Sequence, residues 1–376
     1  MVSFTFIDIL LAIGISQGLF LIIGLQLIKN RNKKINGILS ALLLIAMIML
    51  TGRMIYGRFE SLWIFRVASY IDVVIFLFGP LLYLFVRKLL FIQNKEHGLS
   101  WYHFIPATIH LTAFTFLLFP SEAVLRSYGE RGIFTWAYFL VESIGIILNT
   151  VYVLKSFHLI NTYQTKAVQS VSFAQEGVGF VKLILIAVSS SLVLWCISCV
   201  NSYFLQNTQL SFISYKLIWI SIPVFIYITG FYNLWQPELF RIQPVQKQKV
   251  NYPDRLTKEQ LISLTQRLEQ LMEVDKVYLE NTLTLKDLAV RLQTSSNNIS
   301  WLLNNHYEKS FYEFVNTYRV KEFIHKIEKG EHQTHTLLAL SLDSGFNSKS
   351  TFNKVFKQVV QETPSAFVKN RTSISG

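Results

Sequence analysis

Long apolar stretches alternate with short polar connections through the first 235 residues of the chain. A helix needs about 20 mainly apolar residues to cross the roughly 30 Å of bilayer hydrocarbon. The first stretch is expected to remain as a helix, because Met1–Asp8 lacks the basic residues of a cleaved signal peptide. Stretches of this length occur seven times, and each predicts a membrane helix: Phe4–Ile28, Ile35–Tyr56, Val67–Leu90, Trp101–Phe119, Gly132–Leu154, Gly179–Leu205 and Phe212–Leu234.

Lysine and arginine are concentrated in alternate connections between these stretches, and the sixth connection has none. Short connections rich in these residues stay on the cytoplasmic side of a membrane. We therefore predict that the N-terminus lies outside and that seven crossings deliver the C-terminal third to the cytoplasm, at the inner (cytoplasmic) membrane of a bacterium. The basic residues of the odd connections are Lys29, Arg31, Lys33 and Lys34, then Arg87, Lys88 and Lys95, then Lys155 and Lys166.

The composition changes abruptly after residue 235. A polar linker with two prolines in the run RIQPVQKQKVNYPDR occupies residues 236–256. Thr257 and Gln260 then form a capping box at the start of a helix. Its leucines, spaced alternately by three and four residues, lie on one stripe. This stripe predicts either a short dimerising coiled coil or a helix that packs on the domain behind it; its members are Leu261, Leu264, Leu268 and Leu271.

Two helix-turn-helix patterns follow, about 50 residues apart. In the first, Ala289 is small where a second helix must cross, and Ser295 can cap that helix. The second helix is expected over Ser296–His306, with three apolar residues inward: Ile299, Leu302 and Leu303. In the second pattern, Gly345 stands at the turn, where a positive φ is needed, before a helix over Ser348–Lys357.

These patterns resemble the arabinose-operon regulator (AraC/XylS) family of bacterial transcription factors, in the branch with a multi-span N-terminal region. The resemblance covers about Leu271–Val368 and rests on LTLKDLA, FYEFVNTYRV, GFNSKSTFNKVFK and TPSAF, in that order. It implies two recognition helices in successive major-groove segments, joined by a long helix over about Phe311–Lys326. Family members usually have glycine at three positions that differ here, so we expect the adjoining turns to be built differently: Gln293, Glu308 and Gln361.

The resemblance also implies the residues that read DNA. Asparagine suits adenine edges, lysine suits guanine or phosphate, and serine and threonine suit either. Because the first recognition helix has no lysine or arginine, we expect the second helix and Lys357 to supply more of the electrostatic attraction. The predicted reading residues are Asn297, Asn298, Ser300, Trp301, Asn304 and Asn305 in the first helix, and Lys349, Ser350, Thr351, Asn353, Lys354 and Lys357 in the second.

A charge inside an apolar stretch is costly and calls for a reason, unless it lies near a stretch end and can reach the interface, as Arg53 and Lys182 do. Four other ionisable residues call for a reason. They either line an outward-facing ligand pocket or pair between helices, as Asp72 with Lys216; the four are Asp72, His110, Glu142 and Lys216. Cys196 and Cys199 lack a second pair for zinc and are predicted to be packing residues. No catalytic motif is present, and no cofactor or metal is predicted.

Charge alone does not decide the function. From Trp235 onward the chain carries 19 Lys and Arg against 15 Asp and Glu, and the net charge of +12 includes the cytoplasmic connections. The whole chain is 51% hydrophobic and 15% charged, against about 25% charged in soluble proteins.

The sequence thus predicts an all-α protein: a seven-helix transmembrane bundle over residues 1–235, a linker over 236–256 and a cytoplasmic double helix-turn-helix domain over 257–376. The predicted function is a one-component sensor that binds promoter DNA; the alternative is a membrane receptor or transporter whose helix-turn-helix domain binds protein. Expected partners are double-stranded DNA, the lipid bilayer, a small ligand or membrane signal, RNA polymerase and a second copy of the chain. Coupling is expected to pass through the linker and the helix Leu261–Leu271.

Overall fold

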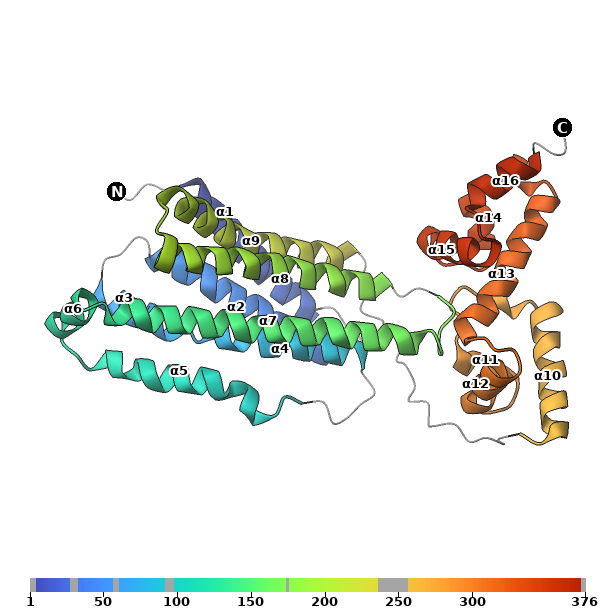
Figure 1. Cartoon of the computed structure of the whole chain (residues 1–376), viewed down its shortest axis with the longest axis horizontal. Helices are drawn as coiled ribbons and strands as arrows, with labels where there is room; N and C mark the ends of the chain where they lie inside the picture. The colour runs from blue at the N-terminus through green and yellow to red at the C-terminus, as the bar shows by residue number, and fades with distance from the viewer. Residues whose placement is uncertain are drawn as a thin grey trace. The chain divides into compact units, whose positions relative to one another are not determined.

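The computed structural model describes residues 5–27, 33–56, 61–91, 98–173, 176–235 and 256–372 (Figure 1). Within these ranges every regular element is a helix, and the β contact Val171–Thr284 is an isolated bridge. The prediction of an all-α fold is confirmed. The chain forms two compact units, one of Met1–Asn161 with Glu176–Pro244 and one of Thr162–Gln175 with Val245–Gly376. The predicted linker lies outside the described residues, apart from Leu256.

The first unit consists of long apolar helices. Its elements are α1 (Phe6–Leu27), α2 (Lys33–Tyr56), α3 (Leu62–Ile71), α4 (Val74–Leu90), η1 (Trp101–Phe104), α5 (Ile105–Thr115), η2 (Phe116–Leu118), α6 (Glu122–Glu130), α7 (Ile133–Ala167), α8 (Glu176–Val200), the π-helical η3 (Asn201–Leu205) and α9 (Thr208–Trp235).

Five of these segments are long and apolar enough to cross a membrane, with α3 and α4 forming one of them. A sixth is possible only as a bent pair, because the chain turns by 119° between Leu118 and α6. Pro120 stands at this bend, and proline removes a helical hydrogen bond and clashes with the preceding turn. The seventh predicted span falls on α9, whose apolar part Lys216–Gly230 is shorter, so seven spans stay a prediction.

The helices of the first unit approach closely at small residues. A Cβ atom added at Gly14 of α1 would lie 2.9 Å from the ring of Pro223 in α9, and one added at Gly18 would lie 2.8 Å from Met47 in α2. Small residues at such crossings let membrane helices gain van der Waals contact. The packing of α1 against α2 and α9 therefore depends on these two glycines.

The second unit contains nine helices among the described residues of its C-terminal part. They are α10 (Lys258–Glu273), η5 (Val277–Leu279), α11 (Leu285–Arg291), α12 (Ser296–Asn305), α13 (Phe311–Glu328), η6 (Glu331–Gln333), α14 (Leu337–Asp343), α15 (Lys349–Val360) and α16 (Pro364–Thr372) (Figure 1).

The long helix α13 contributes to both hydrophobic cores of this unit. Its first half, including Phe311 and Phe314, packs in a core with α10, α11 and α12. Its second half, including Phe323, packs in a core with α14, α15 and α16. In the second core the Phe323 and Phe352 rings lie 4.6 Å apart, a distance typical of favourable aromatic pairs. One helix thus holds two helix-turn-helix motifs together.

The structure of α10 decides between the two interpretations of the leucine stripe. The capping box at Thr257 and Gln260 is confirmed, with both hydrogen bonds formed. Leu264 and Leu268 are buried in the first core, and Leu261 and Leu271 pack against it in part. The stripe therefore serves to pack α10 on its own domain, as one of the two interpretations predicted.

Candidate nucleic-acid interface

Each predicted recognition helix begins at a serine cap. The Ser295 hydroxyl accepts a hydrogen bond from the Asn298 amide at 3.2 Å, and the Ser348 hydroxyl accepts one from the Thr351 amide at 3.3 Å. These side chains satisfy amides that have no partner within the helix. Gly345 adopts a φ of +91°, as predicted, and lies at the start of the turn between α14 and α15. Helices α12 and α15 are therefore fixed at their N-terminal ends.

Most of the predicted reading residues lie on the surface, but two do not. Ser300 of α12 and Thr351 of α15 are buried, with 8% and 4% of their surface exposed, so the prediction that they point outward is wrong. The Thr351 hydroxyl instead accepts a hydrogen bond from Ser348, which keeps it within the cap. Side chains that are exposed or half-buried belong to Asn297, Asn298, Trp301, Asn304 and Asn305 in α12, and to Lys349, Ser350, Asn353, Lys354 and Lys357 in α15.

The asparagine amides of α12 are engaged within the domain. Asn298 donates to the Thr294 hydroxyl, Asn304 donates to the Ser300 carbonyl at 2.8 Å, and Asn305 donates to the Trp301 carbonyl at 2.9 Å. An amide side chain has two N–H donors and one carbonyl acceptor, so these local bonds orient the three amides without by themselves preventing contact with a base edge. The lysines of α15 are exposed.

The three positions without glycine adopt the backbone that glycine would. Gln293, Glu308 and Gln361 have φ values of 51°, 52° and 66°. The prediction that these turns are built differently is therefore wrong. The helices on either side of each turn fix its backbone. Gln293, Glu308 and Gln361 are therefore held in a left-handed conformation that their side chains disfavour.

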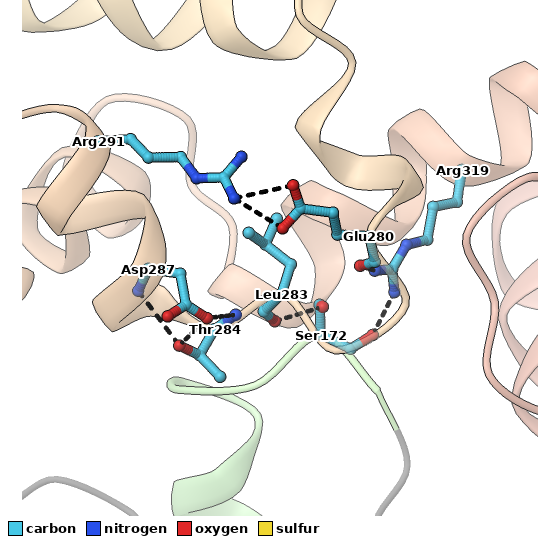
Figure 2. Close-up of polar contacts among 7 residues, drawn as sticks. All are labelled: Ser172, Glu280, Leu283, Thr284, Asp287, Arg291 and Arg319. Carbon is cyan, nitrogen blue, oxygen red and sulfur yellow. Dashed lines mark hydrogen bonds and ion pairs between the residues drawn. The ribbon is translucent and has the colours of Figure 1, made fainter.

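Arg319 of α13 is a fully buried hub that sequence reasoning did not single out. Its guanidinium donates to the carbonyls of Ser172 and Glu280 at 2.8 and 2.6 Å (Figure 2). It also donates to the Tyr278 carbonyl at 2.7 Å and to the side chain of Asn316. Burial lowers the pKa of Arg319 to about 10, so the group stays charged near neutral pH. Its partners come from η5, α13 and the segment after α7, which makes Arg319 the point where these elements join.

The segment Val168–Phe173, which we call the strap, belongs to the second unit although it follows α7 in the chain. The Ser172 side chain donates to the Leu283 carbonyl at 2.7 Å, and the Ser172 carbonyl accepts from Arg319 (Figure 2). The same carbonyl also accepts from the side chain of Asn316. Val171 bridges to Thr284. The sequence offered one weak signal, the alternation of polar and apolar residues from Ser170 to Phe173, which suits an extended backbone.

The predicted polar residues of the first unit are partly brought together. Asp72 at the end of α3 lies close enough to Glu142 of α7 for their charges to interact, and Glu142 also bonds to side chains of α8 and η3. His110 of α5 lies 3.0 Å from the Ser69 carbonyl of α3. A hollow of about 410 Å³ lies nearby, lined by none of the four predicted residues but by Tyr70, Leu111, Thr112, Thr115, Phe116 and Phe119.

The sequence that forms α11 to α16 matches a known domain family. Residues 288–370 match the helix-turn-helix domain family. This is an AraC-type DNA-binding domain. The match runs from α11 into α16 and includes both recognition helices, so DNA is a partner of this domain and its role is regulatory. No curated protein and no solved structure matches the chain.

Proposed function

We propose that the chain is a membrane-tethered transcription regulator, in which a multi-span unit detects a signal and the AraC-type domain binds promoter DNA. The observation that carries the proposal is the combination of this domain with five helical segments that are long and apolar enough to cross a membrane. Whether the signal is a small ligand or a condition of the membrane, it acts on the first unit. RNA polymerase and a second copy of the chain are the further partners.

Helix α7 gives the best support for the membrane. Five apolar side chains, spaced alternately by four and three residues, form an exposed stripe along it: Leu140, Ile144, Ile147, Val151 and Leu154, which are 41–64% exposed. Soluble proteins seldom expose so continuous an apolar surface. The stripe therefore supports contact with the bilayer.

Seven spans follow if the bent pair and α9 both cross. Helix α9 has 28 residues and would be about 42 Å long, which exceeds the hydrocarbon thickness of roughly 30 Å. With the N-terminus outside, the C-terminal domain would lie in the cytoplasm, where it reaches DNA. Reporter fusions at Gly129 and after Gly376 test this: a reporter active only outside the cytoplasm, joined after Gly376, would contradict the orientation.

The predicted ligand pocket remains part of the proposal. The proximity of Asp72 to Glu142 supports a shared polar site between α3 and α7, with His110 packed on the same helix α3 through the Ser69 carbonyl. Lys216 of α9 is proposed as its fourth member. We propose the exposed polar residues of α12 and α15 as the DNA-reading surface.

The test is DNA binding by the full chain in lipid nanodiscs, using double-stranded DNA from upstream of its own coding sequence. Removing one lysine that neutralises a phosphate should reduce the slope of log affinity against log salt by about 0.9. The double variant Lys354→Ala with Lys357→Ala should therefore bind every sequence more weakly and with a slope smaller by up to about 2.

The control is the double variant Lys258→Ala with Lys329→Ala, which removes the same charge from exposed positions outside α12 and α15. It should leave the salt slope unchanged. A full chain that shows no salt-dependent binding to this DNA would contradict the proposed function and favour a protein partner for the helix-turn-helix domain.

A further inference from the structure

The strap satisfies backbone amides at the starts of two helices in the DNA-binding domain. The Ser170 carbonyl accepts from the Leu285 amide of α11 at 3.0 Å, and the Val168 carbonyl accepts from the Tyr312 amide of α13 at 3.1 Å. The first amides of a helix have no partner within it. The strap thus occupies positions that solvent would otherwise fill.

The surface that receives the strap is mainly polar. Asn316 and Arg319 both donate to the Ser172 carbonyl, and the Ser172 hydroxyl donates to the Leu283 carbonyl. Among the apolar side chains of the strap, Val171 is buried at 4% exposure, Phe173 is half-buried and Val168 is 37% exposed. Water can replace hydrogen bonds of this kind, so the strap can leave without exposing a large apolar surface.

The strap also reaches a recognition helix. The side-chain nitrogen Nδ2 of Asn304 lies 3.5 Å from the side-chain oxygen of Gln169. Asn304 is an exposed residue of the proposed reading surface. A major groove about 12 Å wide admits one helix, whose diameter with side chains is about 10–12 Å. A segment held beside Asn304 would therefore lie where the groove wall has to fit, and the docked strap and a DNA duplex would compete for the C-terminal end of α12.

We propose that the strap is an autoinhibitory contact: docked on α11, α12 and α13 it keeps DNA from the first recognition helix, and its release permits binding. This inference rests on the proposed function. The strap lies between α7 and α8, so a signal that shifts the ends of these helices acts on it directly. The expectation that coupling passes only through the linker and α10 is therefore incomplete, because the strap provides a second path.

The first test releases the strap in the full chain in nanodiscs. Val171→Asp places a charge at a buried position and should undock it, whereas Val274→Asp makes the same change at a residue of the same unit that is 72% exposed. If the docked form makes up about 90% of the population, release should tighten DNA binding by roughly tenfold. Hydrogen exchange at the Leu285 and Tyr312 amides should become faster only in Val171→Asp.

The second test locks the strap in place. Val171 and Thr284 lie opposite each other in an antiparallel bridge, and the hydrogen bond from the Leu285 amide to the Ser170 carbonyl joins the residues beside them. Val171 and Thr284 are therefore a non-hydrogen-bonded pair, whose Cα atoms are about 4.5 Å apart. This is within disulfide range. Val171→Cys with Thr284→Cys should therefore bind DNA weakly when oxidised and recover at least tenfold on reduction, while the parent chain responds to neither treatment.

The outcomes separate the two proposals. Faster exchange in Val171→Asp with unchanged or weaker DNA binding contradicts the strap as an inhibitor, as does a locked chain that binds as tightly as the reduced one. Unprotected Leu285 and Tyr312 amides in the wild-type chain contradict the docking itself. If no variant binds DNA at any salt concentration, the proposed function fails, and the inhibitory role fails with it.

Discussion

Gly345 provides the sharpest test of how the DNA-binding domain is assembled. It lies in the turn of the second helix-turn-helix motif, yet a Cβ atom there would lie 2.4 Å from the Tyr278 carbonyl oxygen and 2.9 Å from the Leu279 Cα atom of η5. It would also lie 3.0 Å from Nε of Arg319. We predict that Gly345→Ala strongly destabilises the domain, because two backbone segments would have to separate.

Gly330 is the matched control, since its φ of +82° is close to the +91° of Gly345 and its added Cβ would meet nothing nearer than 3.9 Å. A left-handed alanine costs about 1–2 kcal/mol, offset by about 0.4–1 kcal/mol from the stiffer unfolded chain. Gly330→Ala should therefore lower the free energy of unfolding by roughly 1 kcal/mol. Gly345→Ala adds overpacking of about 1–3 kcal/mol, for a total of roughly 2–4 kcal/mol.

The assay is urea unfolding of the fragment from Val245 to Gly376, followed by far-ultraviolet circular dichroism. With a domain stability of about 5–15 kcal/mol, both variants should remain folded in the absence of urea. The midpoint should fall much further for Gly345→Ala than for Gly330→Ala. Equal losses would refute the reasoning, because they would show that φ alone sets the cost and that the contact with η5 is not tight.

Two further predictions concern the same fragment. Replacing Gln293, Glu308 or Gln361 by glycine should raise the free energy of unfolding by roughly 0.5–1 kcal/mol each, because all three have positive φ; a lower urea midpoint in all three variants would contradict backbone strain. Although burial alone would raise the pKa of Glu322, hydrogen bonds from Lys276 and Tyr278 and the Lys276 charge leave that pKa below its usual value. Its stabilising effect is therefore present above the unfolded pKa of about 4.3 and is lost as the pH falls through the lower folded pKa. Unfolding between pH 3 and 6 should show a shallower acid loss for Glu322→Gln than for the wild-type fragment, and parallel curves would show that Glu322 is not the group responsible.

The features that could be predicted from the sequence depend on interactions between residues that are close together in the chain. The capping box at Thr257 and the serine cap at Ser295 join residues three apart, and Ile299, Leu302 and Leu303 follow the helical period, so no knowledge of distant contacts was needed. The bend before α6 was not predicted, because hydropathy measures apolar length and not direction. Ser300 and Thr351 were misplaced because serine and threonine suit both a surface and a cap.

The remaining features depend on contacts between distant parts of the chain. Ser172 bonds to residues 111 to 147 positions away, and no motif marks it. Gln293, Glu308 and Gln361 carry no glycine signal, so their left-handed backbone reflects the packing of neighbouring helices over local preference. The reading surface of the domain rests on a family resemblance, and which side chains touch bases stays a prediction.

The contact of Arg319 with the strap bears on how strap docking responds to ionic strength, in comparison with DNA binding. Among the residues that the structure describes, its acceptors are carbonyl and amide oxygens, so its charge is balanced by dipoles inside the domain and not by a carboxylate. Mobile ions screen exposed charges but act weakly on buried dipolar contacts, whereas each phosphate contact with DNA releases counterions. Osmotic upshift that raises cytoplasmic salt would therefore weaken the protein–DNA complex and leave the docked strap in place, so the proposed inhibition would be strongest in a salt-stressed cell.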